Sequence, residues 1–115
     1  MLRGDIVVVD FEPARPAESA KERPAIVVSN DRANATASRL GRGTITVVPL
    51  TSNVERIHPF QVLLPADRTG LRENSKAQAE QVRSVSVSRI GRFIGRVPAN
   101  LLAEVDDALR LHLAL

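Results

Sequence analysis

The chain has 115 residues, with 16 lysines and arginines against 13 aspartates and glutamates, and a formal net charge of +3. It contains no cysteine, which excludes disulfides, thiolate metal sites and a cysteine nucleophile. Three phenylalanines and no tyrosine or tryptophan leave little material for the aromatic platforms on which many RNA-binding modules stack bases. A chain of this length is typical of one domain, so we predict a single domain over residues 1–115.

The start of the chain lacks the features of a secretion signal or a membrane span. Arg3 and Asp5 place charges close to the first residue, and the apolar run that follows covers only residues 6–9. A membrane helix needs about 20 apolar residues. We therefore expect a cytoplasmic protein that does not associate with membranes.

Charge is distributed unevenly along the chain. Residues 32–98 carry 11 basic against 4 acidic side chains, a balance of +7, whereas the segments on either side are acidic overall. Of the 16 basic residues 14 are arginine, whose planar guanidinium group binds phosphate bidentately. This pattern suits a phosphate-bearing partner, because cations that neutralise phosphates release bound counterions. Solvated strand faces would produce the same pattern, so charge alone leaves both interpretations open.

Most of the chain predicts short strands. Segments that are rich in β-branched or aromatic residues and bounded by Gly, Pro, Asn or Asp cover residues 6–11, 25–29, 44–50, 60–64 and 93–97. Residues 76–86 predict one or two further strands. Between the second and third strands, residues 31–39 predict a loop or a short helix.

From Ala99 onward the apolar residues recur at helical spacing. One face carries Leu101, Leu102, Val105, Ala108, Leu109 and Leu113, and the other carries Glu104, Asp106, Asp107 and Arg110. Pro98 stands just before this segment, where its fixed φ and missing donor cost little. Strands followed by a last helix predict an α+β domain: a small curled antiparallel sheet closed by a C-terminal amphipathic helix.

Two predicted strands carry a polar residue at one end. Arg23 opens the segment Arg23-Pro-Ala-Ile-Val-Val-Ser29, and Thr51 ends the segment Val47-Val-Pro-Leu-Thr-Ser52. Because a buried strand holds its flanking residues rigidly, Arg23 and Thr51 are candidates for one site. A surface arginine and a turn-forming threonine are the ordinary alternatives.

These two segments, with residues 3–13 at the start and residues 75–84 later, resemble the MazF/PemK/Kid family of bacterial toxins in order and spacing. The resemblance covers essentially the whole chain. It implies an SH3-like barrel of the CcdB/PemK type, a homodimer and a cognate antitoxin protein. It also implies a toxin of a type II toxin-antitoxin system that cleaves single-stranded RNA at specific sequences, without metal or cofactor, and thereby stops translation and growth. The expected products are a 2′,3′-cyclic phosphate and a 5′-hydroxyl.

The resemblance also implies roles for three residues. Arg23 and Thr51 match the two catalytic positions of the family and would stabilise charge on the reacting phosphate. Glu80 matches a position at which relatives carry an aspartate used as acid or base. Glu80 could accept the proton of the 2′-hydroxyl, or it could pair with Arg83 or Lys76.

Residues 13–22 resemble the family's mobile first loop, which covers the RNA groove. Ala17 replaces a histidine to which some members assign catalytic work, so we expect no histidine-assisted proton transfer from this loop. RNA contacts are expected from this loop and from the polar residues near the two strand ends. The candidates are Arg15, Glu18, Lys21, Ser52, Asn53, Lys76 and Gln78.

Two other functions remain open at this point. The chain could be a non-enzymatic toxin of the same fold that binds DNA gyrase, like the CcdB relatives, or an inactive SH3-like adaptor. Neither needs the pair Arg23 and Thr51, whereas gyrase-poisoning relatives depend on residues near the chain end. Here the last residues, 111–115, look like an apolar helix end.

Overall fold

The computed structural model describes residues 1–11 and 22–115. The strands within this part are β1 (Asp5–Asp10), β2 (Glu22–Val27), β3 (Thr44–Thr51), β4 (Gln61–Leu64), β5 (Ser75–Gln78), β6 (Arg83–Ser86) and β7 (Ile90–Arg96). The helices are α1 (Asp31–Leu40), α2 (Ala66–Thr69) and α3 (Ala99–Leu113), with short 3₁₀ turns η1 (Ala79–Gln81) and η2 (Val87–Arg89). None of the helices in the described ranges is long and apolar enough to cross a membrane.

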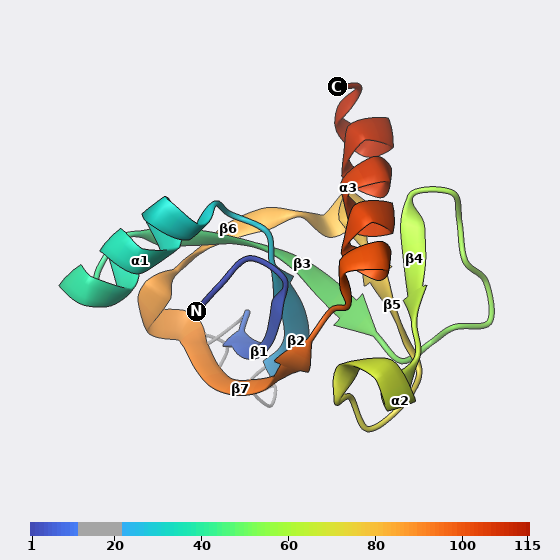
Figure 1. The fold of residues 1–115 in the computed structure, drawn as a ribbon, viewed down its shortest axis with the longest axis horizontal. Helices are drawn as coiled ribbons and strands as arrows, with labels where there is room; N and C mark the ends of the chain where they lie inside the picture. Colours follow the sequence, from blue (N-terminus) through green and yellow to red (C-terminus); the bar gives the residue numbers. More distant parts are fainter. Residues whose placement is uncertain (12–21) are drawn as a thin grey trace, which may run out of the picture.

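The strands form one curled sheet in the order β4-β5-β3-β2-β1-β7, and β6 pairs with β3 beside this path (Figure 1). Neighbouring strands pair antiparallel throughout the described residues. The predicted α+β fold with an antiparallel sheet and a C-terminal helix is thus confirmed. The sheet is not closed into a barrel, since β4 and β7 end the path without pairing with each other.

Both faces of the central strands are buried, which explains why their sequences are almost continuously apolar. On β2, Ile26 packs into one core cluster with Ile6 and Leu64, whereas Val27 packs into a second cluster. Successive side chains of a strand point to opposite faces, so one strand supplies both clusters. Helix α3 covers the first cluster through Leu101, Val105 and Ala108, and α1 contributes Ala37 to the second.

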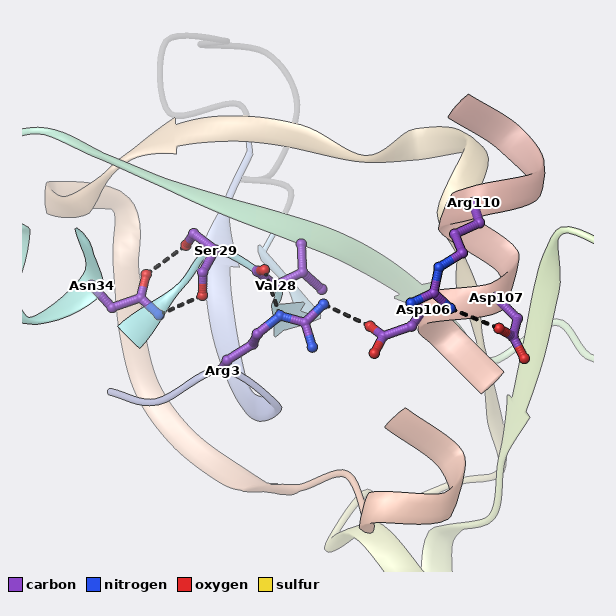
Figure 2. A network of polar contacts seen from close by, with 7 residues as sticks. All are labelled: Arg3, Val28, Ser29, Asn34, Asp106, Asp107 and Arg110. Carbon is purple, nitrogen blue, oxygen red and sulfur yellow. Dashed lines mark hydrogen bonds and ion pairs between the residues drawn. The ribbon is translucent and has the colours of Figure 1, made fainter. Parts of the chain in front are cut away.

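Helix α1 is a complete helix of ten residues, longer than the loop or short helix that the sequence predicts. Its start is fixed by Asn30, whose side-chain oxygen accepts a hydrogen bond from the backbone N–H of Ala33. Its end is fixed by Gly41, which adopts a left-handed φ of 67°. Asn34 is fully buried and bonds to both the hydroxyl and the carbonyl of Ser29, which ties the helix to the end of β2 (Figure 2). The contact between Asn34 and Ser29 involves polar side chains, so the spacing of apolar residues in the sequence does not predict it.

The first residues of the chain are fastened by arginine. Arg3 donates from Nε to the carbonyl of Val28 at 2.9 Å and from Nη2 to the carboxylate of Asp106 at 2.6 Å (Figure 2). Arg96 on β7 pairs with the largely buried carboxylate of Asp5 on β1. The first contact joins the segment before β1 to α3, and the second joins the start of β1 to the end of β7. The groove described below lies at the opposite end of β1 and β2.

Candidate active site

The register between β2 and β3 brings the two predicted catalytic residues together. Ala25 pairs with Pro49, Ile26 with Val48 and Val27 with Val47. Continuing this antiparallel register by two residues places Arg23 opposite Thr51. Both residues line one groove with a volume of about 680 Å³. The prediction that these two strand ends form one site is consistent with this geometry.

The groove is built from segments that are far apart in the sequence. Its lining residues are Val8 of β1, Glu22, Arg23 and Pro24 of β2, Leu50, Thr51 and Ser52 at the end of β3, Gly70, Leu71, Arg72, Glu73 and Ser75, and Arg92, Phe93 and Ile94 of β7. Most of the polar lining residues are exposed, whereas Val8, Leu50, Leu71 and Ser75 are buried and form its floor.

Glycine allows the wall between α2 and β7 to close. A Cβ at Gly95 would lie 1.8 Å from the carbonyl oxygen of Thr69, so no side chain fits there. Gly70 adopts φ +86°, and a Cβ there would approach the carbonyl oxygen of Ile94 to 3.0 Å. The backbone of α2 therefore rests directly on β7. This contact places the segment after Gly70 beside the residues of β7 that face the groove.

Positive charge dominates the exposed lining. Arg23, Arg72 and Arg92 reach the groove, against the carboxylates Glu22 and Glu73. Within residues 1–11 and 22–115, no hydrogen bond or ion pair engages the side chain of any of these three arginines. Their guanidinium groups therefore remain available for an anionic ligand, and two or three of them could hold one or more phosphates.

The polar corner that follows β3 is organised by its own backbone. The hydroxyl oxygen of Thr51 accepts a bond of 3.3 Å from the N–H of Asn53, whose side-chain oxygen in turn accepts one from the N–H of Glu55. Ser52 lines the groove beside Thr51, but Asn53 is not a lining residue. Of the two predicted RNA contacts at this corner, the structure places Ser52 next to the catalytic candidates.

Lys76 lies on the neighbouring strand, in register with Thr51. It is buried, with 9% of its surface exposed, and its ammonium donates to the backbone carbonyl of Arg56. Together with the bond from the N–H of His58 to the side chain of Gln61, this contact holds the segment between β3 and β4 over the sheet. Lys76 is outside the groove lining, so here it supports the loop that follows Thr51.

Glu80 and Gln78 form a separate polar cluster beyond the groove lining. One carboxylate oxygen of Glu80 accepts a 2.8 Å bond from the side-chain nitrogen of Gln61. The other oxygen of Glu80 and the side-chain oxygen of Gln78 are buried and have no hydrogen-bond partner in the described part of the chain. Neither Arg83 nor Lys76 forms an ion pair with Glu80 there. The structure therefore does not bring Glu80 together with Arg23 and Thr51.

Three further candidates, Arg15, Glu18 and Lys21, lie outside the described residues, as does most of the predicted loop at residues 13–22. Conversely, sequence reasoning missed Arg72, Arg92 and Phe93. Arg92 fell before the strand predicted at residues 93–97, although β7 begins at Ile90. The one signal for Arg72 in the sequence was its position two residues after the turn at Gly70.

Comparison with known proteins gives one consistent result. Residues 2–113 match the family described as the PemK-like, MazF-like toxin of type II toxin-antitoxin systems. The chain is 62% identical over 115 residues to endoribonuclease MazF9 of Mycobacterium tuberculosis, covering 100% of this chain and 98% of that relative. It is 29% identical over 114 residues to endoribonuclease EndoA of Bacillus subtilis, covering 98% and 94%.

Solved structures agree with the sequence relatives. MazF from Deinococcus radiodurans superimposes with a TM-score of 0.75 at 28% identity, over 100% of this chain and 97% of that one. A mycobacterial endoribonuclease solved in complex with its cognate antitoxin gives a TM-score of 0.79 at 21% identity, over 100% and 96%. The second likeness supports the fold alone.

Proposed function

The chain belongs to the PemK-like, MazF-like family of type II toxin-antitoxin toxins, and we propose that it cleaves single-stranded RNA in the groove that Arg23 and Thr51 share. It is an endoribonuclease, as its relatives are. The observation that supports the assignment of the site is the register of β2 and β3, whose continuation by two residues beyond Ala25 and Pro49 sets the arginine opposite the threonine. The finer chemistry follows from what these two groups can do to a phosphodiester.

In the proposed reaction the 2′-hydroxyl of one nucleotide attacks the adjacent phosphorus. A P–O bond to the 2′-oxygen forms as the bond to the 5′-oxygen of the next nucleotide breaks, which leaves a 2′,3′-cyclic phosphate and a 5′-hydroxyl. Arg23 binds the non-bridging oxygens bidentately and offsets their growing charge, and the hydroxyl of Thr51 donates to one of them. Because the nucleophile belongs to the substrate, the scheme needs no metal-activated water.

Two proton transfers complete the reaction. The 2′-hydroxyl loses its proton and the departing 5′-oxygen gains one. Glu80 is the acceptor that the family resemblance suggests, but its carboxylate is held by Gln61 outside the groove lining. The scheme therefore passes the first proton to water in the groove and takes the second from water.

The partners we propose are single-stranded RNA, a cognate antitoxin and a second copy of the chain, all in the cytoplasm. Structures of relatives include a MazE–MazF complex from Deinococcus radiodurans at 28% identity, which supports the antitoxin. Leu111, Leu113 and Leu115 are 58%, 49% and 86% exposed at the end of α3, which supports burial of this end in a larger assembly. Gyrase binding and a pure adaptor role are not favoured, because the relatives are named as endoribonucleases.

The test is cleavage of a long single-stranded RNA in EDTA, with 5′ ends mapped by primer extension. We expect discrete cuts from the wild type, and loss of these cuts in Arg23→Ala and Thr51→Val. Arg42→Ala is a matched control, because Arg42 is exposed and lies outside the groove lining. Intact RNA after incubation with folded wild-type protein, with or without EDTA, would refute the proposal. Cleavage that occurs without EDTA but not in its presence would refute metal independence.

A further inference from the structure

The groove has an apolar side that the phosphate chemistry does not use. Next to the three arginines it presents Val8, Pro24, Leu71, Phe93 and Ile94. A site for phosphate alone needs only cations and hydrogen-bond donors. Apolar surface alongside guanidinium groups instead matches a nucleotide, which carries a charged backbone and a flat, weakly polar base.

Phe93 is the most exposed part of this side. Phe11 is buried with the guanidinium of Arg83 5.2 Å from its ring centre, and Phe60 stacks on His58 with the same centroid distance. Phe93 is 61% exposed, and no ring contact involves it within residues 1–11 and 22–115. Of the three phenylalanine rings, Phe93 is the most exposed, and it is the one that lines the groove.

The backbone holds this ring in place. Phe93 lies within β7 and pairs with Val7 of β1, a strand that is itself paired with β2 on its other side. Its neighbour Arg92 also lines the groove. An aromatic ring on a paired strand loses little freedom when a ligand stacks on it, because only two side-chain angles remain to be fixed.

We propose that Phe93 is a stacking platform for one nucleobase next to the scissile phosphate. The proposal rests on the RNA-cleaving function proposed above. Stacking on a phenyl face accepts every base, so Phe93 supplies affinity and positions the strand, while base-edge contacts elsewhere set the cutting sequence. Arg92 contributes charge beside the ring and binds the phosphate that follows the stacked base.

The experiment uses short RNAs that contain the mapped cleavage sequence, with 2-aminopurine on either side of the cut and a 2′-deoxy group in place of the attacking hydroxyl. Stacking quenches 2-aminopurine fluorescence, so we expect quenching at one of the two positions on binding to the wild type. Phe93→Ala should abolish this quenching and weaken binding about tenfold. Phe93→Trp should retain both, and Phe93→Leu should behave like alanine, because leucine is apolar but has no π face.

Leu40→Ala is the matched control, since Leu40 is 48% exposed and lies at the end of α1, outside the groove lining. Wild-type affinity in Phe93→Leu would overturn the platform, because apolar packing would then suffice. A change of oligomeric state in Phe93→Ala, measured by light scattering, would overturn it in favour of a protein interface. If the wild type cleaves RNA and Phe93→Ala cleaves equally well, the platform fails while the nuclease stands. If the wild type neither binds nor cleaves RNA, both fail.

Discussion

Arginine side chains are paired in one region of this molecule and unpaired in another. Near α3, Arg3 is bonded to the carboxylate of Asp106 and the carbonyl of Val28 (Figure 2). Arg96 is bonded to the carboxylate of Asp5. In the groove, arginines reach the surface from three separate segments, and their guanidinium groups bond to nothing in the described residues. The paired arginines fasten the chain ends, whereas the unpaired ones hold positive charge where a ligand would meet it.

The difference shows why a charge count along the sequence was ambiguous. Residues 32–98 carry a balance of +7, which fits both solvated faces and a phosphate site. Arg96 belongs to that stretch but is neutralised by Asp5, and Arg23 lies outside it but faces the groove. Whether an arginine can bind a ligand depends on whether a carboxylate already pairs with it, and that pairing is decided by the fold.

The largest effect expected from this comparison is that of Arg23→Ala. Removing the group that offsets charge on the phosphate should lower the cleavage rate about 10²-fold or more. The thermal midpoint should stay at the wild-type value, because the Arg23 side chain is exposed and bonds to no described residue, and alanine keeps the backbone pairing with Val9. Single-turnover cleavage and thermal melting measure the two quantities. Arg23→Lys is the informative companion, since it keeps the charge and loses the bidentate fork, and it should recover only part of the rate.

A smaller effect is expected when Arg92 is replaced by alanine. If Arg92 neutralises one phosphate, binding to single-stranded RNA should weaken several-fold at low salt. The slope of log K against log salt should then fall by about 0.7. Titrations of a non-cleavable RNA at several salt concentrations give this slope. An unchanged slope in Arg92→Ala, or an equal change in the exposed control Arg42→Ala, would contradict a direct phosphate contact.

Sequence reasoning predicted those candidate site residues that stand beside a recognisable strand. Arg23 and Thr51 each flank a β-branched strand, and strand existence follows from composition. The two residues come close together because of the register of β2 and β3, and this register cannot be predicted from the sequence. Lys76 shows the reverse case. As a lysine in a polar stretch it predicted an RNA contact, but the segment between β3 and β4 folds over it and engages its ammonium at Arg56.

The same reasoning missed the β7 side of the groove and the length of α1. Gly91 interrupts the apolar pattern, so the predicted strand began at residue 93 and excluded Arg92. An edge strand with exposed residues carries little periodic signal. For α1, the signals were present, because Asn30 and Gly41 are typical helix caps, but Leu40 is the one large apolar residue in the segment between them.

Glu80→Gln tests a third region, the polar cluster of Glu80, Gln78 and Gln61, which lies outside the two arginine regions. Glutamine keeps an acceptor for the bond from Gln61 and removes the negative charge. Because Glu80 lies outside the groove lining, we expect cleavage within tenfold of the wild type and a folded protein of equal or higher thermal stability. General bases contribute about 10²- to 10⁴-fold, so a loss in that range would restore Glu80 as the proton acceptor. Single-turnover rates across a range of pH are the measurement.

The smallest effect should come from the region where arginine is paired. The Arg3 and Asp106 side chains are 31% and 30% exposed at a separation of 2.6 Å, so solvent screens much of their attraction. A double-mutant cycle with Arg3→Ala and Asp106→Ala should give a coupling free energy below about 1 kcal/mol in urea unfolding. RNA cleavage by both single variants should equal that of the wild type, because neither residue lines the groove. Loss of cleavage in a folded Arg3→Ala protein would break the comparison, since a paired arginine far from the groove would then serve catalysis as well as folding.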